Sequence, residues 1–118
     1  MQKENVLHQK SYAFAIRTVK LNQYLTLQKK EYTLSKQVLR SGTAIGALVS
    51  ESQFAQSKPD FINKLSISLK EANETHYWIN LLKDTDYIDM KMFESLEKDI
   101  NELLKLLTSI INTMKSSQ

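Results

Sequence analysis

Three basic residues near the start of the chain, Lys3, Lys10 and Arg17, are spaced seven residues apart. In a helix this spacing places them in one row, and Lys20 lies about one turn beyond Arg17. Such a row suits a phosphate backbone, because each neutralised phosphate adds affinity that depends on salt. A solvated helix face carries the same pattern. The row therefore predicts a nucleic-acid-binding surface and leaves an ordinary solvated face open.

Arg40 is a second residue that could contact an anion. It lies in a segment expected to be helical, one position away from the apolar stripe of that segment. An arginine there can instead pair with an acidic residue across a helix or subunit interface. We favour the ion pair and keep the anion contact as the other interpretation.

Patterns for catalysis or metal binding are missing from the sequence. The chain has no cysteine, which excludes thiolate chemistry and cysteine zinc sites. Its two histidines, His8 and His76, lack the Glu-x-x-His spacing of di-iron bundle sites. No histidine follows an arginine closely, as it does in helical RNA-cleaving domains, and no glycine-rich phosphate loop follows a strand. We therefore expect no enzyme activity, no metal and no cofactor, and interpret His76 as a core histidine bonded to a neighbour.

Small residues, among them Ser41, Gly42 and Gly46, are concentrated in a segment that is predicted to be helical. Glycine in a helix costs roughly 1 kcal/mol relative to alanine, so keeping two of them indicates a close backbone approach. The approach is either close helix packing within the chain or a contact between subunits.

The elements that must position these residues follow from hydrophobic period and capping. Helices are expected at about 4–27, 34–56, 58–83 and 90–115, with Thr33, Ser57 and Asp89 as N-caps. Short connections make successive helices antiparallel. The predicted fold is all-α, an up-and-down antiparallel four-helix bundle, with residues 1–118 as a single domain.

The apolar stripes predict which side chains meet in the core. The first helix has Leu7, Phe14, Leu21 and Leu25 on one side, with Val6, Ala13 and Ile16 in a second stripe. The other three stripes are Leu34, Val38, Ser41, Ile45, Leu48 and Ser52; Ile62, Leu65, Leu69, Ala72, His76 and Ile79; and Phe93, Leu96, Ile100, Leu103, Leu107, Ile110 and Met114, with Leu104 and Ile111 widening the last stripe.

Charge is distributed unevenly along the 118 residues. The net charge is +3, but basic residues dominate 1–58 and acidic residues are in slight excess over 59–118. A basic front half suits an anionic partner or the acidic half of the same chain. No apolar run is long enough to span a membrane, and we expect a cytoplasmic protein.

Three segments resemble a known family: Gln37–Ala47 (QVLRSGTAIGA), Ser57–Leu65 (SKPDFINKL) and Lys70–Leu82 (KEANETHYWINLL), with Glu51 between the first two. They resemble the bacterial four-helix bundle proteins encoded in intervening sequences of 23S ribosomal RNA genes. The resemblance covers about residues 10–90 in order.

The resemblance implies a small bundle that assembles as a ring-like homopentamer. It also implies kinship with the accessory variability protein of diversity-generating retroelements, a basic pentamer that binds nucleic acid and a reverse transcriptase. Most members of the family have no established biochemical role.

Two functions follow as hypotheses. The first is a non-catalytic homo-oligomer that binds RNA or DNA through basic side chains of its first two helices: Lys3, Lys10, Arg17, Lys20 and Arg40. The alternative is a protein-interaction scaffold or accessory subunit without nucleic-acid binding, whose basic half contacts an acidic partner or its own acidic face.

Overall fold

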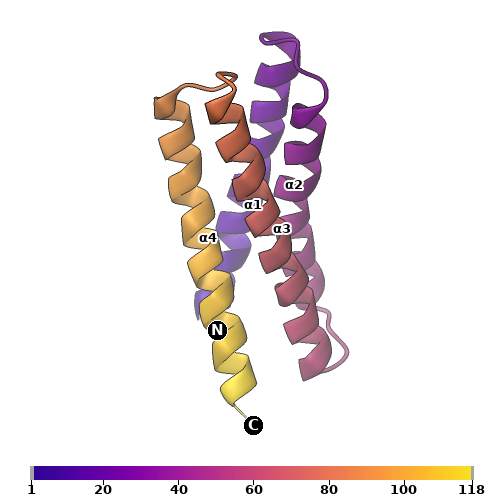
Figure 1. The fold of residues 1–118 in the computed structure, drawn as a ribbon. Helices are drawn as coiled ribbons and strands as arrows, with labels where there is room; N and C mark the ends of the chain where they lie inside the picture. The colour runs from indigo at the N-terminus through magenta and orange to yellow at the C-terminus, as the bar shows by residue number, and fades with distance from the viewer. Residues whose placement is uncertain (1, 118) are drawn as a thin grey trace.

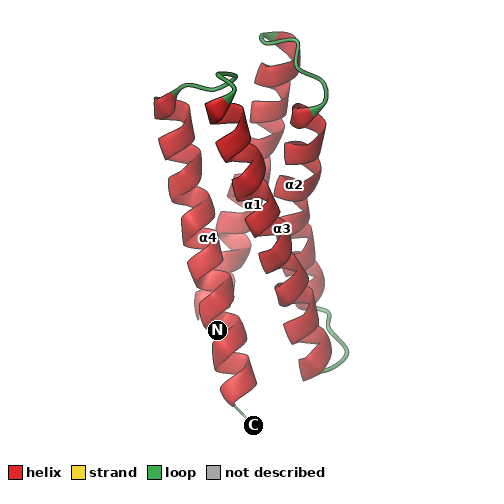
Figure 2. Ribbon diagram, in the orientation of Figure 1, coloured by secondary structure: helices red, strands yellow, loops and turns green. Residues whose placement is uncertain are grey.

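Four helices account for most of the chain in the computed structural model, which describes residues 2–117. They are α1 (Gln2–Leu27), α2 (Leu34–Ser52), α3 (Lys58–Asp84) and α4 (Met90–Ser116). No strand occurs in this range (Figure 2). The all-α prediction is confirmed.

The helices run up and down around a common core. Each packs against two neighbours, so that α1 lies beside α2 and α4, and α3 beside α2 and α4. The loops that follow α1 and α3 lie at one end of the bundle, and the α2–α3 loop lies at the other end with both termini (Figure 1). The bundle measures about 49 × 22 × 19 Å. No described helix is long and apolar enough to cross a membrane.

One predicted boundary was wrong by a full turn. The second helix ends at Ser52 rather than near residue 56. After it, the amides of Gln53, Phe54 and Ala55 each donate to the carbonyl three residues earlier, which tightens the chain into successive turns. Ser57 then caps α3, so the connection between α2 and α3 uses residues 53–56, which the prediction had assigned to the second helix.

Two of the three predicted caps are confirmed. The side chains of Ser57 and Asp89 accept hydrogen bonds from the amides of Asp60 and Met92, at 3.1 and 2.8 Å. Thr33 makes no side-chain cap. The carboxylate of Glu31 replaces it, because its two oxygens accept from the amides of Thr33 at 3.2 Å and Ser35 at 2.7 Å.

The core is apolar along α4 but contains hydroxyl groups between α1, α2 and α3. On α4 the predicted stripe is buried together with Ile111 beside it, and only Met114 and Leu104 are half-buried. On α3 the stripe is rotated: Ser68 and Thr75 are buried, whereas Ile62, Leu69 and His76 are half-buried. These hydroxyls are satisfied across the α2–α3 contact, because Ser68 Oγ donates to the Ile45 carbonyl and Thr75 Oγ1 to Ser41 Oγ, both at 2.9 Å.

The predicted α2 stripe is buried at Val38, Ser41, Ile45 and Ser52, but two further expectations were wrong. On α2, Ser35 and Val49 are buried where Leu34 and Leu48 were expected, and both leucines are half-buried. On α1 the second stripe faces solvent: Ala13 is exposed and Ile16 is 44% exposed. The close α1–α2 contact is made by Gly42 and Gly46 against Thr18 and Ser11, and Ile16 lies outside it.

Candidate nucleic-acid interface

The predicted basic row of α1 lies along the seam between α1 and α4. Lys3 Nζ donates to Ser109 Oγ at 2.7 Å, and Lys10 Nζ lies 3.1 Å from Glu102 Oε1. Arg17 makes the most contacts. Its Nη1 donates to Asp99 Oδ2 at 2.7 Å and to the Ser95 carbonyl at 3.2 Å, and its Nη2 donates to Ser95 Oγ at 3.0 Å.

These contacts join the basic front of the chain to its acidic back. The Arg17–Asp99 and Lys10–Glu102 side chains remain well exposed, so each pair contributes at most about 1 kcal/mol to stability. Three of the predicted nucleic-acid contacts therefore already have partners on α4. A polyanion that used them would compete with Glu102, Asp99 and the serines.

Lys20 and a second row of lysines have no such partners. Lys91, Lys98 and Lys105 are exposed on α4 at seven-residue spacing. Lys98 lies one turn from both Ser95 and Glu102, so its row adjoins the α1–α4 seam. Neither Lys20 nor these lysines forms an ion pair within residues 2–117.

Together these side chains make a basic face over α1 and α4. Three acidic residues share it, Glu94, Asp99 and Glu102, which leaves four positive charges in excess. The whole chain carries only +3, so the positive charge is concentrated on this side. The basic residues of the face are Lys3, Lys10, Arg17, Lys20, Lys91, Lys98 and Lys105.

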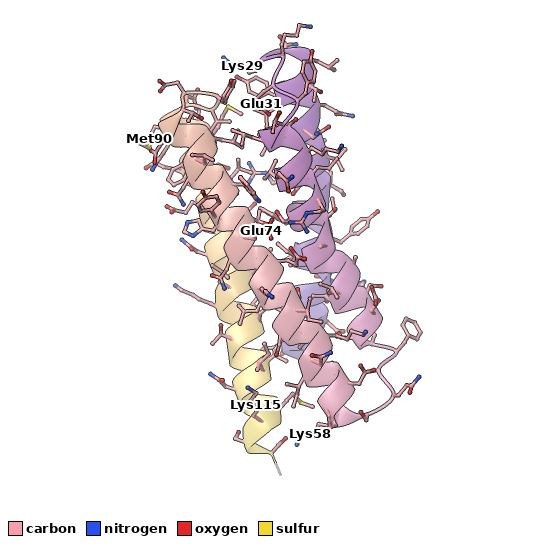
Figure 3. All side chains as sticks on the ribbon, turned by 45° about the vertical axis from the view of Figure 1, so that its right-hand side comes forward. Lys29, Glu31, Lys58, Glu74, Met90 and Lys115 are labelled. Atoms are coloured by element: carbon pink, nitrogen blue, oxygen red, sulfur yellow. The ribbon has the colours of Figure 1, made fainter. Side chains whose placement is uncertain are left out.

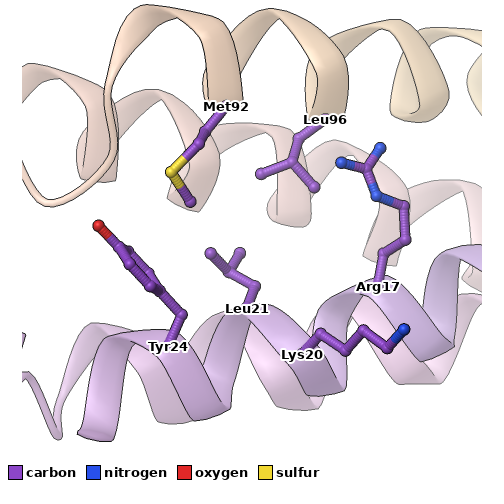
Figure 4. A pocket seen from close by; sticks show the side chains of 6 residues that line it. All are labelled: Arg17, Lys20, Leu21, Tyr24, Met92 and Leu96. Atoms are coloured by element: carbon purple, nitrogen blue, oxygen red, sulfur yellow. The ribbon is translucent and has the colours of Figure 1, made fainter. Parts of the chain in front are cut away.

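A groove opens in the basic face between α1 and α4 (Figure 4). Its volume is about 290 Å³, and apolar side chains line most of it, with Arg17 and Lys20 at one end. The contacts between α1 and α4 are sparser than those of α1 with α2, and long side chains such as Lys10 and Arg17 bridge the two helices. The apolar lining consists of Leu21, Tyr24, Met92 and Leu96.

Arg40 lies away from the basic face and joins α2 to α3. Its Nη1 lies 3.3 Å from Glu71 Oε1, and its Nη2 forms a short contact with Glu74 Oε2. Trp78 Nε1 also donates to Glu74, at 2.9 Å, and this bond together with Arg40 lowers the pKa of Glu74. The hydrogen bond that Arg40 donates to Glu74 in turn raises the pKa of Arg40. This is the ion pair that the sequence favoured, and Figure 3 shows Glu74 midway along α3.

The small residues bring helices together within the chain. A Cβ on Gly42 would lie 2.6 Å from Thr18 Cγ2, and one on Gly46 would lie 3.1 Å from the Ser11 carbonyl oxygen. Ser41 is fully buried and accepts the hydrogen bond from Thr75. Both glycines therefore let α1 approach α2, and Ser41 joins α2 to α3.

The two histidines occupy different environments. His76 Nε2 lies 2.9 Å from Glu97 Oε2 and joins α3 to α4. His8 Nδ1 is buried and has no hydrogen-bond partner in the described chain. Among residues 2–117, no three His, Asp or Glu side chains gather closely enough to hold a metal ion.

Sequence reasoning missed the Lys91, Lys98 and Lys105 row. Its seven-residue spacing is the same signal that identified Lys3, Lys10 and Arg17. The row lies in the half of the chain with an acidic excess, so counting charge by segment hid it. Charge summed along a sequence does not report how charge is distributed over a surface.

Comparisons with known proteins agree with the fold. A family model of 23S rRNA-intervening sequence proteins matches residues 3–109. The chain is also similar to the crystal structure of a protein with unknown function from the S23 ribosomal protein family of Bacteroides thetaiotaomicron. The two are 54% identical, the match covers 93% of this chain and 98% of that one, and the TM-score is 0.92. No curated protein matches the chain.

Proposed function

Because the chain belongs to the family of 23S rRNA-intervening sequence proteins, we propose that it is a non-catalytic bundle protein that assembles with copies of itself and binds nucleic acid through its basic face. The resemblance seen in the sequence is confirmed over residues 3–109, and so is the bundle fold that it implied. Nucleic-acid binding and assembly are the steps beyond that.

The observation that carries nucleic-acid binding is the set of cations on the basic face that form no ion pair with any residue of 2–117. Lys20 on α1 and the Lys91, Lys98 and Lys105 row on α4 are free to exchange their counterions for phosphates. Contacts of this kind read the backbone rather than the sequence, and their affinity falls steeply with salt. The basic residues paired with α4 raise the local positive potential but are held in place.

A non-catalytic role fits the polar groups that the structure places together. His76 is paired with Glu97, and Arg40 with Glu71 and Glu74. These groups brace neighbouring helices, and none of them lines the groove of the basic face. A nucleophile and base directed into a common cleft would have favoured an enzyme.

Self-assembly is supported by the outer face of α1. Tyr12, Ile16 and Val19 lie on one stripe and are 66%, 44% and 42% exposed. The same stripe continues through Asn5, Gln9 and Gln23, so it carries no charge over five turns. Exposed apolar stripes without charge are typical of interfaces. A hollow of about 460 Å³ beside it, lined in part by His8, Thr43, Gly46 and Ala47, extends the uncharged surface onto α2.

Fluorescence anisotropy of labelled single-stranded RNA, single-stranded DNA and duplex DNA, titrated at several salt concentrations, tests nucleic-acid binding. We expect binding with a steep salt dependence. The triple variant Lys91→Gln, Lys98→Gln and Lys105→Gln should weaken it, and should flatten the slope of log K against log salt by about 2 to 3.

A matched variant controls for lost charge. The control variant, Lys36→Gln with Lys64→Gln and Lys70→Gln, removes an equal number of positive charges from α2 and α3. We expect it to leave most of the affinity. Equal losses in the two triple variants would contradict binding through the basic face. Flat anisotropy of the wild type at low salt would instead favour the alternative, a scaffold whose basic residues serve to hold its own helices.

A further inference from the structure

The groove in the basic face has an apolar lining next to positively charged side chains. These two features are complementary to the base and the phosphate of a nucleotide. Leu21 and Leu96 are buried and form its floor, and Tyr24 and Met92 are half-buried on either side. Figure 4 shows Tyr24 on α1 and Met92 on α4 facing each other across the opening. The apolar part therefore suits a flat group of low polarity.

Cations lie at both ends of this apolar surface. Arg17 and Lys20 border one end. At the other end, Lys29 Nζ lies 5.9 Å from the centre of the Tyr24 ring. Lys91 immediately precedes Met92 on α4. The groove is thus apolar inside and surrounded by positive charge. This combination is complementary to a flat group attached to an anionic chain.

The two cations that line the groove differ in whether they are already paired. Arg17 is held by Asp99 and Ser95, so it fixes the end of the groove. Lys20 has no ion pair in the described chain, and it lies one turn before Tyr24 on the same helix. One helical turn advances about 5.4 Å along the axis, so an anion at Lys20 would place a neighbouring group beside Tyr24.

We propose that this groove takes an unstacked base of single-stranded nucleic acid, with the base against Tyr24 and Met92 and the adjoining phosphate at Lys20. The inference rests on the proposed nucleic-acid binding and adds its substrate class. A duplex keeps its bases stacked and paired, so it can use the lysine rows but not the groove. Aromatic side chains stack on any base, so the preference is for single strands rather than for a sequence.

The test compares oligouridine RNA with an abasic strand of the same length and charge, by anisotropy at one fixed salt concentration. Stacking of a base on an aromatic side chain contributes about 1–3 kcal/mol, so we expect the wild type to bind oligouridine about five-fold or more tightly than the abasic strand. Tyr24→Leu keeps an apolar side chain but loses the ring, and it should abolish this difference. Tyr77→Leu changes a tyrosine that is 61% exposed on α3 and should preserve it.

The outcomes separate this inference from the proposed function. Equal binding of the two strands by the wild type would overturn the base site, while salt-dependent binding of both would leave backbone binding intact. A full base preference in Tyr24→Leu would also overturn it. If the wild type bound neither strand at low salt, the proposed function itself would fail and the base site with it. Circular dichroism of both variants checks that the helices are retained.

Discussion

At the scale of single residues, Glu31 organises the turn from α1 into α2. Its side chain is 9% exposed and its carboxylate takes the place of an N-cap for α2. Burial raises the pKa of a carboxyl group, but hydrogen bonds from the amides of Leu34, Ser35 and Thr33 more than offset this, and the pKa of Glu31 lies below its ordinary value of 4.5. Ser35 Oγ donates to the Glu31 carbonyl at 2.7 Å, which closes the turn.

Glu31→Gln should therefore destabilise the protein by about 1 kcal/mol at pH 7, the usual loss for a cap. Because the folded pKa is lowered, the contribution of Glu31 is fully present above pH 4.5 and is lost as the pH falls through the folded value. Urea unfolding of the two proteins should thus give free energies that converge in acid. Glu94→Gln, at an exposed position of α4, should have little effect. A Glu31→Gln difference that is unchanged at pH 3 would argue against the cap.

At the scale of elements, the helix pairs use different kinds of contact. Glycine residues and side chains with hydroxyl groups allow α1, α2 and α3 to lie close together, as at Gly42 against Thr18 and Ser41 against Thr75. Long charged side chains join α1 to α4 and leave grooves between them. The α1–α2 and α2–α3 contacts are therefore close, whereas α1 and α4 contact each other more sparsely, and the α1–α4 side carries the positive charge.

Gly42→Ala tests the close side. The new Cβ would lie 2.6 Å from Thr18 Cγ2, and Thr18 cannot move easily because it is buried and its hydroxyl donates to the Phe14 carbonyl. We expect overpacking to destabilise the protein by about 1–3 kcal/mol, only partly offset by the higher helix propensity of alanine.

Making the same substitution in a Thr18→Ala variant tests whether Thr18 causes the destabilisation. With Thr18→Ala already present, the clash is largely removed while the propensity gain remains, so Gly42→Ala should become neutral or stabilising. Thermal or urea unfolding of the four proteins in this cycle measures the coupling. An equal cost of Gly42→Ala in both backgrounds would show that Thr18 does not limit the α1–α2 distance.

At the scale of the whole molecule, two neighbouring faces differ in charge. The basic face covers α1 and α4, whereas the outer stripe of α1 through Tyr12, Ile16 and Val19 is uncharged. Copies that met through the uncharged stripe would keep the basic faces open and bring several of them together. Clustered basic faces bind a polyanion more strongly than one face does, because later contacts are intramolecular. We propose this arrangement because the resemblance seen in the sequence implies a ring-like homopentamer.

Tyr12→Glu with Ile16→Glu should therefore shift the protein toward the monomer in sedimentation velocity, because each carboxylate would lose its hydration in an apolar contact. The matched control is Ile67→Glu with Tyr77→Glu on α3, at residues that are 38% and 61% exposed. We expect the control to keep the size of the wild type. An assembly that survives in the α1 variant and dissociates in the control would place the interface on α3.

The sequence alone determined the four helices, two of their caps and the stripe of α4, because hydrophobic period and capping are local properties of the chain. It also identified Gly42 and Gly46 as sites of close approach. It could not determine how far each helix is rotated about its axis, which is why Ser68 and Thr75 are buried where Leu69 and His76 were expected. Only the tertiary structure decided which cations remain free. Pairing Arg17 with Asp99 depends on the register of α1 against α4, and a contact across 82 positions leaves no trace in local spacing.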